Sequence, residues 1–345
     1  MAANLIEIRI KGKEVWVHSA RINDRIIIVM GKWIRMATVK DEDWLEGGDV
    51  PNPDLFITEL KEQTVKADIF AFSQCLLDIE RRYPYKFEWD NFAAIPLTNF
   101  EGWWEQRLPQ ETRKNVRRAG RRGVIVRPVE LNDELIQGIA DIYNSTPILQ
   151  GVPNAHYGKD FYAIKNMIST FPDTSQFLGA YCRSELIGFI KLVYMGKIAG
   201  IMHIVSKNQH NDKRPTNALI AEAVRICCQN GRSYLVYGKY TYGNKTDSPL
   251  TEFKRRNGFE KILIPRYYIP LTLRGKIAVK LKLHRGLLGL LPSPVISLCL
   301  NLRAKLVQFR LRLLPKHRLR LDGVVQVQNA PGINSESVKE RSANQ

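Results

Sequence analysis

The first forty residues alternate apolar and polar side chains, which predicts an antiparallel meander. Such alternation gives each strand one apolar face for a core to cover. The alternating pieces cover residues 5–10, 15–17 and 25–39. Lys11-Gly12 and Asn23-Asp24 separate these pieces and favour a change of chain direction. This part therefore predicts strands and carries no recognisable catalytic group.

Further along, the pattern changes between short apolar runs and helical spacing. Residues 67–82 are amphipathic, which predicts a packing helix. We expect strands over 92–97, 124–129, 177–181, 187–195, 198–205, 234–237 and 262–271. We expect helices over 100–108, 109–120, 133–143, 160–169, 218–229 and 249–257. Such alternation predicts an α/β (α+β) fold in which helices flank a mixed, twisted sheet.

Residues 231–272 form the most specific stretch. A short apolar strand is followed by Asp247-Ser248-Pro249, a capping side chain directly before a first-turn proline. The short helix that begins there ends at Gly258, which suits a left-handed cap. Phe259 and a second strand follow, in which Tyr267 and Tyr268 point to opposite faces.

This order resembles the GNAT-like acyltransferases, and more closely their FemAB-like branch. The residues that carry the resemblance are Phe253-Lys254, Asn257-Gly258-Phe259, the strand 265–271, Trp103-Trp104 and the basic run 113–124. It covers roughly 95–272, and it implies either one GNAT-like sheet or two tandem GNAT-like halves. The domains expected are a β-rich half-domain over 1–94, the acyltransferase domain over 95–272, a basic amphipathic segment over 273–321 and a disordered tail over 322–345.

Composition places the expected domain in a reducing compartment. The chain of 345 residues is 44% hydrophobic, which is enough for a sizeable core. Its five cysteines form neither a CxxC pair nor a Cys/His ligand spacing, so a zinc site is not expected. No basic-then-apolar leader opens the sequence, and we expect a cytoplasmic protein that needs no metal.

The formal charge of +18 is concentrated in two stretches. Residues 107–127 hold eight Lys or Arg and one acid, and residues 271–321 hold twelve and none. Two such stretches predict a polyanionic partner: a lipid-linked or nucleotide-linked substrate, an anionic membrane, or RNA. Arg113, Lys114 and Arg117 are the candidates for phosphate contacts, with solvated helix faces as the alternative.

The resemblance directs the search for a co-substrate to residues 207–217. In GNAT families that use acetyl-CoA, a glycine-rich loop at a helix N-terminus binds the pyrophosphate through backbone N–H groups. Here that loop holds no glycine, which weakens the acyl-CoA interpretation and leaves aminoacyl-tRNA as the other donor. Lys213, Arg214 and Asn217 are the candidate co-substrate contacts.

The resemblance also implies a catalytic group. Many GNAT acetyltransferases have a tyrosine acid four positions before the helix-ending glycine, but here this position is Lys254. A Phe-Lys pair on this helix matches the FemAB pattern, which gives Lys254, with Phe253 beside it, an electrostatic role toward the acyl group. The alternative is that Lys254, Arg255 and Arg256 form one solvated face.

Other candidates lie on neighbouring segments. Tyr267 is a candidate proton relay and Arg266 a substrate contact, although aromatic residues on a central strand are more often core. Lys239 and Tyr240 end a strand, where α/β sheets place ligands, and are candidate substrate contacts. His156 is either a general base or an ordinary surface residue of the loop 147–158.

The basic C-terminal region predicts contact with a membrane surface. Residues 286–302 are uncharged but interrupted by Pro292 and Pro294, which is short for a bilayer span. With cations on both sides, they favour an interfacial segment on anionic lipid; a helical pair packed on the domain is the alternative. We therefore expect a location peripheral to the inner face of the membrane.

These observations predict an N-acyltransferase that transfers an acyl or aminoacyl group to an amine of a cell-envelope precursor or exopolysaccharide sugar. The expected co-substrate is acyl-CoA or aminoacyl-tRNA, and the expected partners are a phosphate-bearing or sugar acceptor, an anionic membrane and tRNA. One alternative is an acetyl-CoA-dependent N-acetyltransferase. The other is a non-catalytic GNAT-shaped module that binds RNA or anionic membrane.

Overall fold

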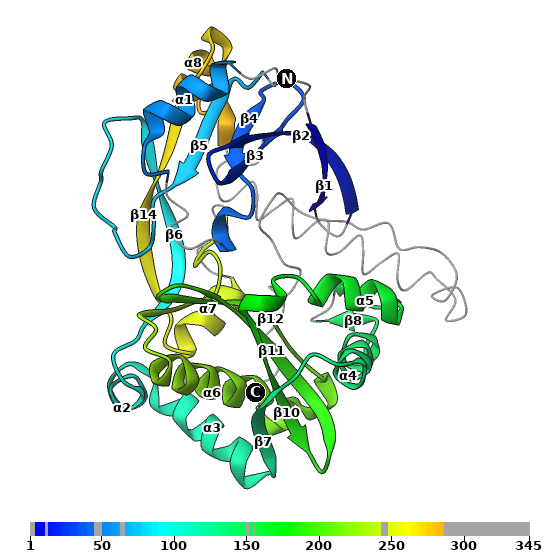
Figure 1. Cartoon of the computed structure of the whole chain (residues 1–345). Helices are drawn as coiled ribbons and strands as arrows, with labels where there is room; N and C mark the ends of the chain where they lie inside the picture. The colour runs from blue at the N-terminus through cyan, green and yellow to red at the C-terminus, as the bar shows by residue number, and fades with distance from the viewer. Residues whose placement is uncertain are drawn as a thin grey trace. The chain divides into compact units, whose positions relative to one another are not determined.

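A computed structural model of the chain describes residues 4–10, 13–44, 50–62, 66–149, 152–154, 156–242 and 248–285. The chain divides into two compact units, coloured along the sequence in Figure 1. Among the described residues, unit 1 contains those up to Phe92 and those from Ile262 on, and unit 2 contains those from Ala93 to Lys261. The expected segment 286–302 and the expected tail 322–345 lie outside the described residues.

Unit 1 is built on a mixed sheet. Its strands, in hydrogen-bonded order, are β1 (Asn4–Ile10), β2 (Lys13–Ile22), β3 (Arg25–Met30), β4 (Met36–Val39), β5 (Ile69–Ser73) and β14 (Glu260–Pro270), the last belonging to unit 1 from Ile262 on. Neighbouring strands are antiparallel except β4 and β5, which are parallel. The predicted meander is confirmed, and the single piece expected over 25–39 is two strands, β3 and β4.

The core of unit 1 lies between this sheet and α1 (Pro53–Glu62). Phe56 of α1 stacks on Phe70 of β5, with ring centroids 6.1 Å apart. Phe72 stacks in turn on Tyr267 of β14 at 5.1 Å. A 3₁₀ turn (η1, Glu42–Trp44) precedes α1, and α8 (Leu273–Lys280) and a 3₁₀ turn (η5, Leu283–Arg285) follow β14.

The helix expected over 67–82 is wrong. Ile69–Ser73 is strand β5, and every residue of it is buried. A strand that is covered on both faces reads as a continuous apolar run, and periodicity cannot separate such a run from a buried helix. The apolar residues that follow at Leu77 and Ile79 are exposed and lie outside any regular element.

Unit 2 contains the second mixed sheet. Its strands, in hydrogen-bonded order, are β6 (Phe87–Pro96, in unit 2 from Ala93), β13 (Tyr234–Val236), β12 (Ile198–Ser206), β11 (Glu185–Met195), β10 (Ser175–Cys182) and β7 (Val124–Val129). Neighbours are antiparallel except β12 and β13, which are parallel. A β-bulge interrupts the β11 and β12 pairing after Lys191.

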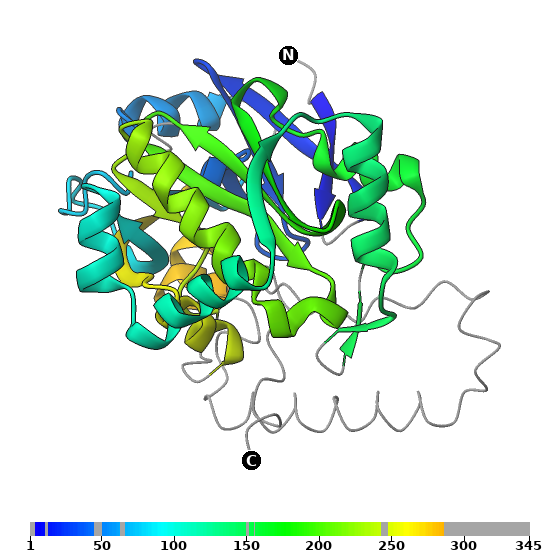
Figure 2. The same ribbon diagram turned by 90° about the horizontal axis from the view of Figure 1, so that it is seen from below.

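Helices cover both faces of the sheet in unit 2, as Figure 2 shows from below. They are α2 (Phe100–Gly102) with a π-helical turn (η2, Trp103–Arg107), α3 (Gln110–Arg121), α4 (Asp133–Asn144), α5 (Phe161–Ile168), α6 (Pro215–Gln229) and α7 (Pro249–Arg256). Short turns η3 (Pro172–Thr174) and η4 (Asn208–Lys213) and the hairpin of β8 (Ile148–Leu149) with β9 (Val152–Pro153) complete the unit.

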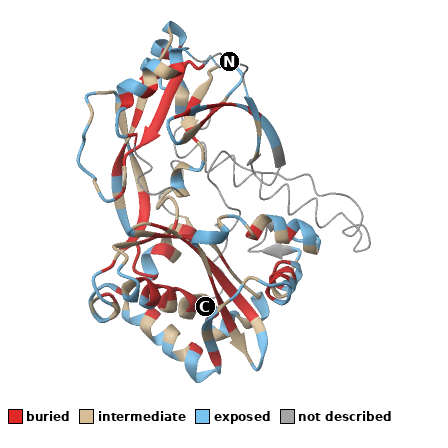
Figure 3. Cartoon of the chain, in the orientation of Figure 1, coloured by how far each residue is buried: buried red, intermediate tan, exposed pale blue. Residues whose placement is uncertain are grey.

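Alternation on the central strands explains the two layers of helices. Leu178 of β10 and Ile190 of β11 belong to the core shared with α6. Their neighbours Phe177 and Phe189 belong to the core shared with α4 and α5. These strands are consequently buried on both faces, as the red residues in Figure 3 show. The expected fold class, a mixed sheet flanked by helices, is confirmed.

None of the helices in the described part of the chain has the length and apolar character needed to cross a bilayer.

Candidate functional site

The helix α7 is fixed at both ends by its own sequence. The Ser248 hydroxyl accepts a hydrogen bond from the Thr251 backbone N–H at 3.1 Å and caps the N-terminus. At the other end, Gly258 has φ +78°, and the Phe259 N–H donates to the Lys254 carbonyl at 3.0 Å. Phe259 is buried, so the cap also anchors the chain in the core.

Lys254 is the central residue of this helix. It is 0% exposed, and its Nζ donates to the Lys239 carbonyl oxygen at 2.6 Å. The ammonium also lies over two aromatic rings, 4.7 Å from the centroid of Tyr237 and 4.8 Å from that of Tyr242. A carbonyl dipole and two π faces all favour the charged amine.

The two arginines that follow have a different environment. Arg255 and Arg256 are exposed, and both donate to the carboxylate of Glu252 at 2.7 Å. Their hydrogen bonds, that of Arg255 foremost, lower the pKa of Glu252 to about 2. The row of three cations is therefore not one solvated face, because its first member is inside the protein.

Other predicted site residues lie close to Lys254: Phe253 is next to it on α7, and Lys239 and Tyr240 contact this helix. The Phe253 ring meets Tyr237 edge-on, with centroids 6.4 Å apart. The Tyr240 carbonyl accepts a hydrogen bond from Thr251 at 3.3 Å, and burial raises the pKa of its phenol. Lys239 takes part through its backbone oxygen. The structure thus brings Lys254, Phe253, Lys239 and Tyr240 together within unit 2.

The C-terminal end of α7 is tied to α6 and α3. Asn257 is buried, its amide donates to the Phe253 carbonyl at 2.8 Å, and its side-chain oxygen accepts from Asn217 at 2.9 Å. Thr112 of α3 donates to the Arg256 carbonyl at 2.6 Å. These bonds hold the helix that carries Lys254 against the two helices that carry the expected phosphate contacts.

The expected co-substrate residues lie where α6 begins. Arg214 is exposed, adopts the left-handed conformation at φ 57° and precedes Pro215, the first residue of the helix. The Nζ of Lys213 lies 3.0 Å from Nδ1 of His210. Asn217 uses its side chain for the bond to Asn257. All three residues are at the N-terminus of a 15-residue helix, where backbone N–H groups attract anions.

The expected phosphate contacts lie on α3. Lys114 and Arg117 are exposed, and the Arg117 guanidinium lies 5.7 Å from the ring centroid of Trp104. Arg113 is partly buried and forms an ion pair with Glu105. Thus Lys114 and Arg117 present their charges to solvent, whereas the charge of Arg113 is shared with a carboxylate.

Tyr267 and Arg266 belong to unit 1, with Lys254 in unit 2. The Tyr267 hydroxyl donates to the Gln74 side-chain oxygen at 2.8 Å and accepts from the Arg82 N–H at 3.1 Å. Arg266 donates to Glu42 at 2.9 Å; burial opposes its charge, but the Glu42 carboxylate raises its pKa. Each side chain is engaged inside unit 1, and the proton-relay and substrate-contact roles stay predictions.

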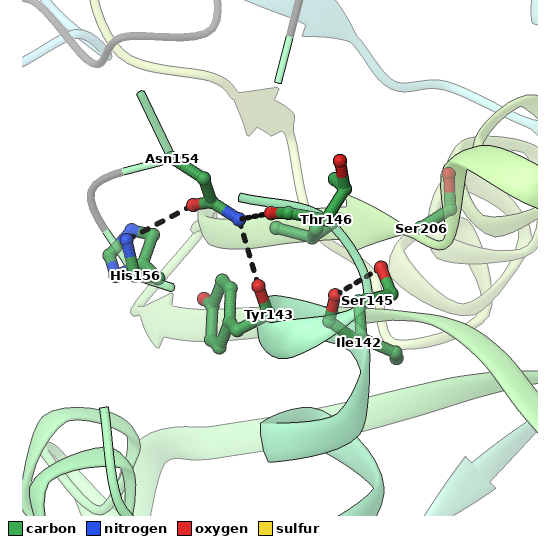
Figure 4. A pocket seen from close by; sticks show the side chains of 8 residues that line it. Ile142, Tyr143, Ser145, Thr146, Asn154, His156 and Ser206 are labelled. Carbon is green, nitrogen blue, oxygen red and sulfur yellow. Dashed lines mark hydrogen bonds between the residues drawn. The ribbon is translucent and has the colours of Figure 1, made fainter. Parts of the chain in front are cut away.

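His156 is one of the residues that line a small pocket in unit 2 (Figure 4). Asn154 shapes it by donating to the carbonyls of Tyr143, at 2.8 Å, and Thr146, at 3.0 Å. The His156 ring lies 4.4 Å from that of Tyr143, and its Nδ1 is buried without a hydrogen-bond partner among the described residues. Ser206 lines the same pocket and bonds to Thr216 of α6 at 3.1 Å.

Electrostatics keep this histidine neutral. Burial, assisted by the charge of Lys159, lowers the pKa of His156 to about 4. Burial also lowers the pKa of His203, a neighbour of Tyr143, to about 3. Because its Nδ1 is buried, His156 is not an ordinary surface residue, but a pKa this far below neutral makes its imidazole a weak base.

The comparisons with known proteins concern the fold. No protein-family model matches the chain, and no curated protein sequence does. Among solved structures, FemX aligns over 81% of this chain and 90% of its own, at 10% identity and a TM-score of 0.54. L-PGS from Bacillus licheniformis aligns over 79% of this chain and 89% of its own, at 15% identity and a TM-score of 0.50. The chain has a GNAT-like fold of the FemAB type.

In this FemAB-type fold, the contacts of three residues near Lys254 were not anticipated from sequence, although Asn257 is among the residues that carry the resemblance. Tyr237 and Tyr242 supply the aromatic faces, and Asn257 connects α7 to α6. The run Tyr237-Gly-Lys-Tyr-Thr-Tyr242 was a usable signal, because three aromatic residues close to a lysine-bearing helix suit a cation. Asn257 gave no such signal, since asparagine is common at helix ends.

Proposed function

We propose that this GNAT-like, FemAB-type chain is an N-acyltransferase. It transfers an acyl or aminoacyl group to an amino group of a cell-envelope precursor or an exopolysaccharide sugar. The observation that carries the proposal is the burial of Lys254 while Arg255 and Arg256 on the same helix stay exposed. An ammonium inside a protein is costly unless its neighbours stabilise the charge, and the Lys239 carbonyl and two tyrosine rings do so here.

The proposed chemistry assigns Lys254 an electrostatic role. The acceptor amine attacks the carbonyl carbon of the donor thioester or ester, a C–N bond forms, and the carbonyl oxygen becomes an oxyanion. The C–S or C–O bond then breaks, and the thiol or ribose hydroxyl leaves with the proton released by the amine. The Lys254 ammonium stabilises the oxyanion, and a group placed in this way contributes about 10²- to 10³-fold to the rate.

The donor is acyl-CoA or aminoacyl-tRNA. Both carry phosphates, for which the N-terminus of α6, with Lys213 and Arg214, is the proposed binding region. Lys114 and Arg117, exposed on α3, are proposed to contact further phosphates of tRNA or of the acceptor, with Arg113 beside them. The loop before α6 lacks glycine, which favours side-chain over backbone contacts to the donor.

The test uses the full chain and two donors. Binding is measured by calorimetric titration with acetyl-CoA and with a mixture of charged tRNAs. Transfer is then followed with the labelled donor that binds, offered to a UDP-linked, amine-bearing wall precursor and to amino-sugar oligosaccharides. We expect Lys254→Met to lower turnover at least 100-fold with unchanged donor affinity, because methionine keeps an unbranched side chain, one heavy atom shorter, and removes the ammonium with its hydrogen bond to the Lys239 carbonyl.

Arg255→Met is the matched control, one residue further along the same helix and exposed. Its turnover should stay within twofold of the wild type. Wild-type turnover in Lys254→Met would refute the catalytic role of Lys254. Failure of the wild type to bind either donor would refute acyl transfer and leave the non-catalytic module that binds RNA or anionic membrane.

A further inference from the structure

The helix α8 in unit 1 presents a line of apolar side chains to solvent. Leu273 and Ile277 of the helix and Leu281, its C-cap residue, follow one another at intervals of four residues, and their exposed fractions are 74%, 51% and 57%. Residues at this spacing lie on one side of a helix. Large apolar side chains that are exposed together mark a binding surface more often than isolated ones do.

The opposite side of α8 is fixed on the sheet of unit 1. Ala278 and Val279 are buried against Ile69 of β5. Gly275 approaches the residue before that strand so closely that an added Cβ would lie 1.9 Å from the Asp68 carbonyl oxygen. The Thr272 hydroxyl, which caps the helix, donates to the Asp68 carboxylate at 2.9 Å. The helix therefore cannot roll to bury its apolar line without losing these contacts.

Cations flank the apolar line. Arg274, Lys276 and Lys280 are exposed on α8, and no acidic residue occurs from Leu271 to Leu321. Next to the helix, Trp33 is 86% exposed, and its carbonyl accepts a hydrogen bond from Arg274 at 3.3 Å. We call the three apolar residues and these three cations the α8 face.

We propose that the α8 face docks on an anionic phospholipid surface. This goes beyond the proposed acyl transfer and does not depend on it. Apolar side chains enter the boundary between headgroups and acyl chains, while lysines and arginines beside them meet lipid phosphates. The exposed Trp33 indole is suited to the same interface.

The α8 face could be covered by anionic lipid or by the apolar residues 286–302 of the same chain, and its positive charge favours lipid. Residues 286–302 contain no acid, so covering the α8 face with them would bring no counter-charge to Lys276 and Lys280, whereas Arg274 already interacts with the Asp68 carboxylate. An anionic lipid surface supplies both an apolar layer and phosphates. Each cation near such a surface contributes about 1 kcal/mol, so two lysines correspond to roughly 30-fold in the partition coefficient.

The test is co-sedimentation of the full chain with vesicles in the absence of donor and acceptor. One set contains phosphatidylcholine alone, and the other contains phosphatidylcholine with about one third phosphatidylglycerol. We expect the wild type to prefer the anionic vesicles at least tenfold, with Leu273→Gln/Ile277→Gln and Lys276→Gln/Lys280→Gln each losing tenfold or more. These positions are exposed, so the variants should fold as the wild type does.

Ile125→Gln, an exposed apolar residue on β7 of unit 2, is the matched control and should bind vesicles as the wild type does. Lys254→Met should do the same, which separates this result from the test of catalysis. Unchanged vesicle binding by Leu273→Gln/Ile277→Gln would overturn the proposal. A lowered Tm for that variant with unchanged vesicle binding would assign the face to residues 286–302 instead.

Discussion

At the scale of single residues, burial shifts the pKa values of several side chains away from those usual for their residue type. Lys191 of β11 is buried, donates to the Ile168 carbonyl at 2.7 Å, and has its pKa lowered by burial to about 8. His156 and His203 are partly buried in the same unit, have lowered pKa values and stay neutral at neutral pH. Lys254 is held in a way similar to Lys191, by a carbonyl oxygen and two aromatic rings around its ammonium.

The depressed histidines predict a loss of stability in acid. The pKa of His156 is about 4 in the folded chain and about 6.5 when unfolded, so between these values the unfolded state binds more protons. The contribution of His156 to the free energy of unfolding is fully present above pH 6.5 and decreases as the pH falls toward 4. The loss from pH 7 to pH 5 is about 2 kcal/mol for His156, and His203 adds to it in the same direction.

Urea unfolding at pH 7 and pH 5 measures this loss. His156→Gln should reduce the difference between the two pH values by about 2 kcal/mol, because glutamine does not titrate. His18→Gln, at an exposed position of β2, should leave the difference as in the wild type. Equal pH dependence in wild type and His156→Gln would contradict the buried, neutral state of this histidine.

At the scale of elements, α7 depends on its C-terminal glycine. The left-handed φ of Gly258 disfavours any side chain, and a Cβ there would lie 2.9 Å from Nε1 of Trp103. We expect Gly258→Ala to lower the free energy of unfolding by about 2 to 3 kcal/mol, of which about 1 kcal/mol is the backbone term.

Gly123→Ala isolates that backbone term. Gly123 has φ +76°, and an added Cβ would meet no atom within 4 Å. We expect Gly123→Ala to lower the free energy of unfolding by about 1 kcal/mol. Denaturant titration of both variants measures the two losses. Equal losses in the two variants would show that the contact with Trp103 relaxes without cost.

The same elements show what local sequence determines. Capping residues and apolar period located α7, the hairpin of β10 and β11, and α6 to within a few residues, because those signals act between neighbours in the chain. Strand β5 was missed because burial on both faces removes the alternation that identifies a strand. The bond from Asn217 to Asn257 joins residues forty positions apart, so no local pattern encodes it.

The candidate site also combines features that local sequence predicts with contacts that only the folded chain shows. The Phe253-Lys254 pair was found through its resemblance to a family pattern, but only the packing of α7 against residues 237–242 separates Lys254 from Arg255. Lys239 was predicted to contact substrate, but in the structure it contributes its backbone carbonyl oxygen to Lys254. Because every residue has a backbone carbonyl, residue type could not predict this contact. Partly buried His203 and buried Lys191 lie in segments whose sequence indicates ordinary strands.

At the scale of the whole molecule, the excess positive charge occurs in both units. The described part of unit 2 carries it on α3, and that of unit 1 carries it on α8. We assign the first to nucleic-acid or substrate phosphates and the second to lipid. The two assignments can be separated, because binding to nucleic acid has a characteristic dependence on salt.

Filter binding of mixed charged tRNA between 50 and 200 mM salt tests the assignment of α3. We expect Lys114→Gln/Arg117→Gln to weaken binding and to reduce the slope of log K against log salt by about 2. Lys276→Gln/Lys280→Gln should leave that slope unchanged while it lowers vesicle binding. If both pairs alter the slope equally, the two basic regions do not have separate partners.

The sequence order of the two units has a consequence for synthesis on the ribosome. Strand β5 of unit 1 lies between β4 and β14, but β14 follows the whole of the described part of unit 2 along the chain. At about 5–20 residues per second, the residues between Phe92 and Ile262 take roughly 10 to 30 s to translate. During that interval the β14 edge of β5 has no native partner. The nascent segment up to Phe92 therefore carries an unpaired strand edge that a chaperone could protect until β14 is made.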